Sequence, residues 1–269
     1  MEEEEKPMTA ARWSIVLLLF LAVAAAGIAV GAHLWKKDLR VARVETEGNR
    51  IVTGKEIAAL AAIAKNERLF DVDLSATRHR VEQNRYIKSA FVRRDAPDGI
   101  KVAVVERVPI AAIVTDRVLY LDAEGVVLPA VTSDEVFDLP VVTGEIPAAD
   151  CVPGNHVSSK AIREAIDILV TAQRVGEDLS HLLSEVHIDG DKDILLYTAE
   201  AGVPVVFGHG NAAMKMVTFD GFWKHVVMQR GAASVASIDL RYENQVVVRW
   251  ANGLTDQADG QPTSTTAAR

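Results

Sequence analysis

A single cysteine close to a histidine is the first pattern in this sequence that could carry chemistry. Cys151 and His156 lie on either side of the turn-forming residues Pro153 and Gly154. A thiol beside an imidazole can act as nucleophile and base, but such a pair is set by a spatial geometry that this spacing does not imply. We therefore interpret Cys151 as an incidental loop residue. Because it is the only cysteine, the chain has no internal disulfide bond.

Four acidic residues fit part of a calcium-binding loop. Asp189, Asp191, Asp193 and Glu200 fall at positions 1, 3, 5 and 12 of that template. The template requires glycine at its sixth position, where this chain has Ile194, and the residues that follow have the pattern of a strand. We predict a solvated hairpin turn here and no metal site.

Other signatures of catalysis are missing. The sequence has no Gly-x-Ser-x-Gly elbow and no His-x-x-x-His or Cys-x-x-Cys pair. A formal net charge of −8 and a pI near 5.4 provide no basic field for nucleic acid. The sequence therefore offers no candidate catalytic residue, no cofactor site and no small-molecule substrate site. A membrane-anchored hydrolase is an alternative without a supporting motif.

A long apolar segment near the N-terminus precedes the elements that carry Cys151, His156 and the acidic residues. The residues between Trp13 and Trp35 carry no charge. At about 1.5 Å per helical residue, the segment spans roughly 30 Å, the thickness of the hydrocarbon core of a bilayer. Tryptophan at both ends suits the membrane–water boundary. We predict one transmembrane helix over residues 13–35, and a disordered tail over residues 1–12.

This apolar segment allows other interpretations. It could be a cleaved signal peptide with Val30-Gly31-Ala32 as the cleavage site, although its acidic start and its length are untypical of one. More basic residues follow the segment than precede it, and this bias by itself places the C-terminal side in the cytoplasm. The bias is weak evidence here because long domains can translocate regardless of flanking charge.

The residues after this segment predict an α+β module over residues 41–108. The order β-α-α-β-β predicts a small three-stranded sheet with two helices on one face. This order, directly after a membrane anchor, resembles the POTRA module, whose members usually bind other polypeptides, often by strand addition to a sheet edge. The predicted elements are a strand at residues 41–45, helices with N-caps Thr53 and Asp73, and strands at residues 87–94 and 100–106 joined by a Pro-Asp-Gly turn.

Short strands and two helices follow, over residues 109–250, and predict a C-terminal domain with an antiparallel sheet and flanking helices. Amphipathic helices are predicted from Ser159 and from Asn211. The last two strands alternate about a turn near Asn244, with Ile238, Leu240 and Tyr242 on one face of the first and Val246, Val248 and Trp250 on one face of the second. Residues 251–269 have the composition of a disordered tail.

The closing segment Ile238-Asp239-Leu240-Arg241-Tyr242 and the alternating strand after it are similar to the end of the FtsQ/DivIB family of bacterial cell-division proteins. The likeness covers nearly the whole chain. It is carried by the order and spacing of the POTRA-like module, Glu106-Arg107-Val108-Pro109-Ile110-Ala111, Leu119-Tyr120-Leu121-Asp122-Ala123-Glu124-Gly125, Leu139-Pro140, Val205-Val206-Phe207-Gly208 and the closing segment.

This resemblance implies a single-pass inner-membrane protein with a cytoplasmic N-terminus and a periplasmic body at the division site. It implies a non-enzymatic scaffold that binds FtsB and FtsL, contacts other divisome proteins through the POTRA domain, and helps to regulate septal peptidoglycan synthesis. In the family the last strands receive FtsB by strand addition, and the matching contacts here are Arg241, Tyr242 and Trp250. Ordinary sheet packing of Tyr242 and Trp250 is one alternative. A POTRA protein of secretion or outer-membrane assembly is another.

Overall fold

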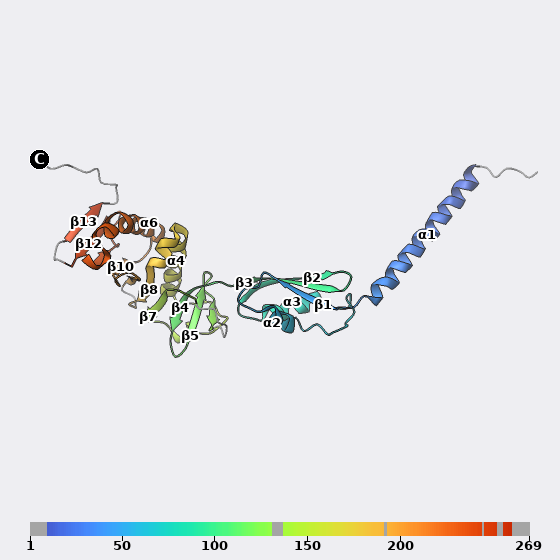
Figure 1. Cartoon of the computed structure of the whole chain (residues 1–269), viewed down its shortest axis with the longest axis horizontal. Helices are drawn as coiled ribbons and strands as arrows, with labels where there is room; N and C mark the ends of the chain where they lie inside the picture. Colours follow the sequence, from blue (N-terminus) through green and yellow to red (C-terminus); the bar gives the residue numbers. More distant parts are fainter. Residues whose placement is uncertain (1–9, 131–136, 191–192, 244, 252–254, 260–269) are drawn as a thin grey trace, which may run out of the picture. The chain divides into compact units, whose positions relative to one another are not determined.

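The computed structural model describes residues 10–130, 137–190, 193–243, 245–251 and 255–259 of the 269-residue chain (Figure 1). The chain divides into two compact units, Met1–Glu106 and Arg107–Arg269.

The first element is one long helix, α1 (Ala10–Asp38). Within it, Trp13–Gly31 is long and apolar enough to cross a membrane, and none of this stretch is buried against the rest of the protein. A helix that is apolar on all sides and unburied is stable in lipid rather than in water. The helix therefore has the properties expected of the predicted transmembrane segment.

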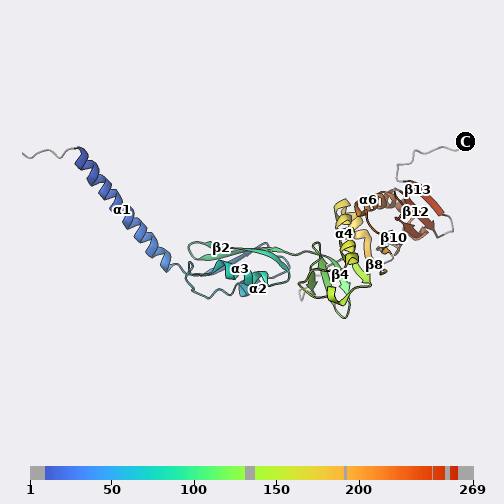
Figure 2. The ribbon, with the colours of Figure 1, turned by 180° about the vertical axis from the view of Figure 1, so that it is seen from behind.

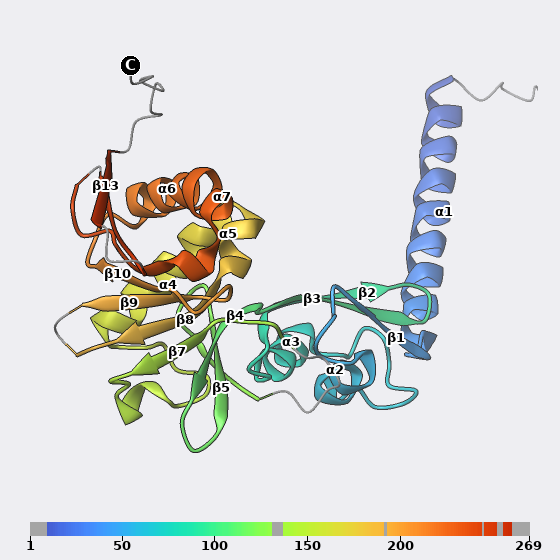
Figure 3. The same cartoon turned by 60° about the vertical axis from the view of Figure 1, so that its left-hand side comes forward.

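The rest of the N-terminal unit is a three-stranded sheet with two short helices, in the predicted β-α-α-β-β order. The sheet order is β1-β3-β2, with β1 parallel and β2 antiparallel to β3. Both helices lie on the same face of the sheet, as Figure 3 shows. The elements are β1 (Arg43–Glu47), α2 (Gly54–Ala61), α3 (Leu74–Glu82), β2 (Ile87–Asp95) and β3 (Gly99–Glu106).

Side-chain caps fix where these two helices begin. The Thr53 hydroxyl accepts a hydrogen bond from the Glu56 amide at 3.2 Å, and one oxygen of Asp73 accepts from Ser75 and Ala76 at 2.9 and 3.0 Å. Each bond satisfies an amide that has no partner inside the helix. Both helix starts were predictable because a cap depends on a few consecutive residues.

A glutamate clamps the end of β3 to the loop before α2. The Glu106 carboxylate accepts hydrogen bonds from the backbone amides of Arg50, Ile51 and Val52 at 2.9, 2.7 and 2.8 Å. Hydrogen bonds to an ionised acceptor are stronger than neutral ones. This one side chain therefore holds together two segments that are far apart in the sequence.

The C-terminal unit is built on one mixed sheet, in which ten strands are hydrogen-bonded among the described residues. The spatial order is β13-β12-β11-β10-β9-β8-β7-β4-β5-β6. The strands are β4 (Pro109–Val114), β5 (Val118–Asp122), β6 (Val127–Pro129), β7 (Val141–Gly144), β8 (Leu183–Ile188), β9 (Ile194–Thr198), β10 (Pro204–Gly208), β11 (Val235–Asp239), β12 (Gln245–Trp250) and β13 (Thr255–Asp259).

The sequence had suggested an antiparallel sheet, but the sheet is mixed. Strand pairs β4–β7, β7–β8 and β10–β11 are parallel. A parallel pair needs a crossover connection, which is usually a helix. Two of these crossovers contain the flanking helices: α4 (Lys160–Val175) and α5 (Glu177–Leu182) between β7 and β8, and α6 (Ala212–Phe222) between β10 and β11.

Helices α4 and α6 lie side by side, as Figures 1 and 2 both show, and their apolar stripes complete the core. In the predicted stripe of α4, Ile162, Ala165, Ile166 and Leu169 are buried and Val170 is partly buried. Met216 and Phe219 of α6 are also buried. Trp223 and Val227 continue this stripe although Trp223–Val227 is a single π-helical turn, followed by α7 (Met228–Arg230). The predicted helix from Asn211 to near Gly231 is therefore continuous in space but irregular in its hydrogen bonding.

The C-terminal residues differ from the expected tail without regular structure. Residues 255–259 form β13 and pair antiparallel with all of β12 except its last residue, Trp250. Residues 252–254 and 260–269 lie outside the described part of the chain. Composition did not predict this strand, because the backbone amides of an exposed edge can pair with a strand of almost any sequence.

Candidate partner-binding site

Arg241 and Tyr242 lie in the turn that joins β11 to β12, rather than on a strand. β11 ends at Asp239, whose carboxylate accepts a hydrogen bond from the backbone amide of Arg241 at 3.0 Å. An aspartate that binds the amide two residues on forms a local turn and interrupts strand pairing. The predicted alternation therefore stops at Leu240, which is buried, and Tyr242 is 54% exposed.

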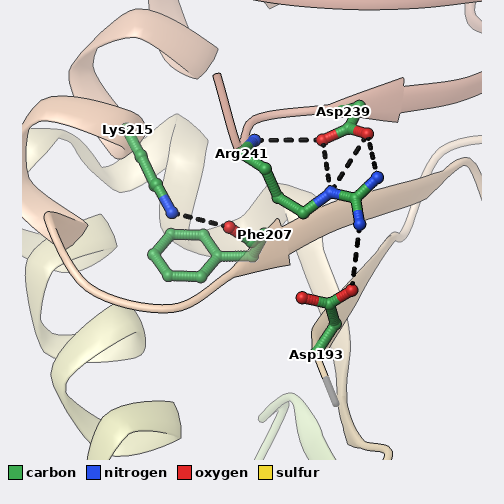
Figure 4. A network of polar contacts seen from close by, with 5 residues as sticks. All are labelled: Asp193, Phe207, Lys215, Asp239 and Arg241. Carbon is green, nitrogen blue, oxygen red and sulfur yellow. Dashed lines mark hydrogen bonds and ion pairs between the residues drawn. The ribbon is translucent and has the colours of Figure 1, made fainter. Parts of the chain in front are cut away.

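A network of ion pairs fixes the side chain of Arg241 (Figure 4). Its Nε and one terminal nitrogen donate to the two carboxylate oxygens of Asp239 at 3.0 and 2.6 Å. The other terminal nitrogen donates to Asp193, at the β8–β9 hairpin, at 3.1 Å. A guanidinium held by two carboxylates in this forked geometry is well oriented. Arg241 therefore anchors the turn that displays Tyr242.

The charges in this network stabilise one another. Hydrogen bonding to Asp239 raises the pKa of Arg241 above its ordinary value, and the charge of Asp193 adds to this effect. Burial alone would raise the pKa of Asp239, but its hydrogen bonds with Arg241 outweigh burial and lower that pKa. Both groups are therefore ionised throughout the physiological pH range.

A glycine makes room for the Arg241 side chain. Gly208, the last residue of β10, has a φ of +69°, and a Cβ atom there would lie 2.7 Å from Cγ of Arg241. A side chain at this position would meet both a strained backbone and a steric clash. Nδ1 of the next residue, His209, contacts a carboxylate oxygen of Glu164 at 2.9 Å, and the carboxylate is the acceptor.

Tyr242 lines a cavity of about 310 Å³ at the start of β12. Lys215 of α6 also lines it, and its ammonium group donates to the carbonyls of Phe207 and His209 at 2.7 and 2.8 Å. Burial lowers the pKa of Lys215. The exposed side chain of Met214 adds an apolar wall. The cavity thus combines an aromatic ring, an apolar thioether and a positive charge, a suitable site for an apolar side chain next to a carboxylate.

Lys215 was not singled out from the sequence. It lies on α6 in a helix whose apolar periodicity predicts core packing, and no local pattern distinguishes it from a surface lysine. Only the folded chain brings its ammonium group over the Phe207 ring, 4.5 Å from the ring centre.

The structure does not bring Trp250 together with Arg241 and Tyr242. Trp250 is at the far end of β12 from Tyr242, only 7% exposed, and belongs to the hydrophobic core. The guanidinium of Arg230 lies over its ring at 4.6 Å, and its indole Nε1 has no hydrogen-bond partner among the described residues. This geometry is that of a packed residue beneath the strand rather than of an exposed contact.

Cys151 and His156, the pair that could have acted as nucleophile and base, contact other residues. The thiol of Cys151 faces the carbonyl oxygen of Pro147 at 3.7 Å, and burial raises its pKa. The His156 ring contacts the carbonyl oxygen of Glu124 instead. A thiol with a raised pKa and no imidazole partner is a poor nucleophile.

In the calcium-loop pattern, Asp193 is the partner of Arg241, and Asp191 lies outside the described residues. Among the residues that the structure describes, no group of three or more His, Cys, Asp or Glu side chains could hold a metal ion.

Two family descriptions cover most of the chain. Residues 39–107 match "POTRA domain, FtsQ-type" and residues 108–249 match "FtsQ/DivIB, C-terminal related". The chain is 30% identical to the cell division protein FtsQ of Syntrophotalea carbinolica, over 90% of this chain and 86% of the relative. It is 29% identical to that of Rhodothermus marinus over 88% of each chain, and 28% identical to that of Geotalea daltonii over 78% and 75%.

Proposed function

The chain belongs to the FtsQ/DivIB family of bacterial cell-division proteins, and from this premise we propose that it is a non-enzymatic divisome scaffold. The scaffold binds the FtsB–FtsL pair through the turn and edge at the end of its C-terminal sheet, and through this contact it helps to assemble and regulate septal peptidoglycan synthesis. A single observation carries the proposal. An exposed tyrosine, Tyr242, is held beside a cavity by the Arg241–Asp239–Asp193 network at the start of the last long strand.

This geometry supports protein binding rather than catalysis. Interface hot spots are large aromatic or arginine side chains in pre-organised surroundings, because little conformational entropy is then lost on binding. Arg241 is fixed before the partner arrives, so Tyr242 is displayed on a rigid turn. The edge of β12, which β13 occupies in the structure, would add backbone hydrogen bonds to a partner strand that takes the place of β13, and such bonds give strand addition much of its affinity.

Trp250 has a different role in this proposal from that of Tyr242. Because Trp250 is buried beneath β12, with the Arg230 guanidinium over its ring, it supports the strand by packing in the core.

In this proposal the site lies outside the cytoplasm. The helix α1 serves as a single inner-membrane span with its N-terminus in the cytoplasm and the two units in the periplasm at the division site. The POTRA unit contacts further divisome proteins. Exposed Phe91 of β2 and Val105 of β3 are the apolar side chains available on its sheet.

The decisive test is direct binding of the full chain in nanodiscs to the extracytoplasmic segments of the FtsB–FtsL pair of the same organism. We expect Tyr242→Ala to weaken binding by about 30-fold, corresponding to a hot spot of about 2 kcal/mol. Met228→Ala is the matched control, because Met228 is also exposed but lies on α7, away from the cavity. Equal affinity of the two variants would overturn the proposed site.

Localisation gives an independent test. A fluorescent protein fused before Met1 should gather at the division site of constricting cells. An even membrane signal through constriction would contradict the divisome role and favour a POTRA protein of secretion or outer-membrane assembly.

A further inference from the structure

The outermost strand of the sheet, β13, is made from the chain's own C-terminal residues. Its five residues pair with β12, with Asp259 opposite Gln245 at one end and Thr255 opposite Arg249 at the other. We propose that β13 is an internal competitor, which occupies the strand-addition edge of β12 until a partner strand displaces it. This inference rests on the proposed function, since it concerns the regulation of the same edge.

The opposite edge of the sheet is closed in a different way. β6 is short and ends in Pro129, and a loop bonds to its outer side: the amide of Gly154 donates to Val127 at 2.7 Å, and the amide of Val127 donates to Asn155 at 2.9 Å. Short strands, proline and a covering loop are the usual protections of an edge. Partner strands can therefore add to this sheet at its β12 side but not at β6.

β13 is a weak covering for that side. Its sequence, Thr-Asp-Gln-Ala-Asp, has no large apolar residue and two aspartates, which are depleted in strands. The pairing thus depends on backbone hydrogen bonds, each of which contributes a net of about 1 kcal/mol. A partner strand with large β-branched or aromatic residues on one face would add cross-strand packing to the backbone hydrogen bonds.

The edge beneath β13 needs a covering when no partner is bound. β12 contains three consecutive valines, of which Val246 and Val248 point into the core and Val247 lies on the other face, partly exposed. A bare, valine-rich edge strand is a template for pairing with other copies. A strand that covers this edge weakly prevents such pairing but still yields to the correct partner.

The pairing register links displacement to the Tyr242 cavity. Asp259 pairs with Gln245, and Gln245 lines the cavity together with Tyr242. A partner strand that replaces β13 in the same direction therefore has its C-terminal end beside this cavity. The partner can place a side chain there and gain an anchor, and this gain favours exchange.

Truncation separates the competitor from the rest of the tail. We compare the full chain in nanodiscs with a chain that ends at Ala251, which lacks β13, and with a control that ends at Asp259, which keeps it. The probe is the purified extracytoplasmic FtsB–FtsL pair. If β13 covers β12 in roughly nine molecules of ten, its removal should make binding about tenfold tighter in the chain that ends at Ala251. We expect unchanged binding in the chain that ends at Asp259.

A reversible lock gives the converse test. Val247 and Gln257 are paired positions on β12 and β13, so Val247→Cys with Gln257→Cys, in a Cys151→Ser background, can join the two strands by a disulfide. We expect the oxidised protein to lose at least about tenfold in affinity, and dithiothreitol to restore it. Restoration shows that the locked protein is folded, and the single Val247→Cys variant controls for the substitution on β12.

The outcomes are distinguishable. Equal affinity of all three chain lengths, or weaker binding of the chain that ends at Ala251, would overturn the competitor and leave the proposed function standing. Normal binding of the oxidised lock would do the same. Absence of binding in every variant would overturn the proposed function, and the competitor with it.

Discussion

The carboxylate of Asp193 lies 3.1 Å from a terminal nitrogen of Arg241, and this contact joins the β8–β9 hairpin to the turn that displays Tyr242. The two residues are 48 positions apart in the sequence. A contact over this separation fixes the turn against the body of the sheet, so a change at Asp193 should alter partner binding without touching the partner.

We predict that Asp193→Asn weakens binding of the FtsB–FtsL probe by about three- to tenfold, as expected for a loosened but not deleted anchor. The reason is that Asp239 alone then orients Arg241. Isothermal titration calorimetry would measure the change. Asp178→Asn is the matched control, since Asp178 is also an acidic member of an exposed ion pair, with Lys224 at 3.8 Å. A loss of equal size in both variants would contradict the role given to Asp193.

Gly208→Ala should destabilise the C-terminal unit by more than the backbone strain alone, because its Cβ would also clash with Arg241. Strain of a left-handed residue costs about 1–2 kcal/mol. Gly202→Ala separates the two effects, since Gly202 has a φ of +61° and no atom within 4 Å of its Cβ position. Denaturant unfolding of both variants measures the difference.

In an Arg241→Ala background the extra loss at Gly208 should disappear, because the clashing side chain is gone. An unchanged difference between the Gly208→Ala and Gly202→Ala variants would show that the clash is relieved in some other way.

The unfolding free energy should fall in acid partly because of Asp150. Its buried carboxylate accepts hydrogen bonds from the Ser158 amide and hydroxyl at 2.6 and 2.7 Å, and from the Ser159 amide at 2.9 Å. Burial raises its pKa, but these bonds together outweigh burial and lower it below the unfolded value. The stabilisation is therefore complete above the unfolded pKa of about 3.9 and is lost as the pH falls through the folded pKa.

Asp150→Asn should therefore destabilise the protein at pH 7, by about 1–3 kcal/mol, and should destabilise it less near pH 3. Unfolding experiments at the two pH values measure this. A loss that stays constant between them would mean that ionisation of Asp150 does not contribute.

Glu106→Gln should loosen the POTRA unit. The substitution weakens the acceptor for the amides of Arg50, Ile51 and Val52, and we expect a loss of about 1–3 kcal/mol. Amide hydrogen exchange at residues 50–52 should accelerate. Glu45→Gln, which removes one charge of an exposed ion pair with Arg43, should change little. Unaltered exchange at residues 50–52 would disprove the clamp.

Trp250→Phe should leave partner affinity nearly unchanged, since Trp250 is buried beneath β12 rather than exposed. The variant also removes a buried indole N–H that has no partner among the described residues, which offsets part of the lost packing. We expect a stability change of less than about 1.5 kcal/mol, in contrast to about 3–5 kcal/mol for Trp250→Ala. A tenfold loss of affinity in a stable Trp250→Phe protein would make the indole a direct contact.

Features that depend on neighbouring residues could be predicted from the sequence. The apolar segment from Trp13 predicted α1, and the caps Thr53, Asp73 and Ser159 predicted three helix starts. Helical periodicity predicted which faces of α4 and α6 are buried. Each of these signals lies within a few turns of chain, where a cap or a periodic stripe has the same meaning in any fold.

Contacts between distant segments could not be predicted and are seen in the folded chain alone. Strand register, rather than a local pattern, underlies four features of the fold. These are the parallel pairing of β10 with β11, the contact of Asp193 with Arg241, the burial of Trp250, and the pairing of β13 with β12. Tyr242 shows the reason most clearly. Its alternation with Ile238 and Leu240 predicted a strand, but the Asp239 carboxylate bonds to the Arg241 amide and turns the chain before Tyr242 is reached. Asp193, just before β9, and Gly208, at the end of β10, hold the Arg241 side chain from outside this segment, and no local pattern in the sequence contains these two contacts.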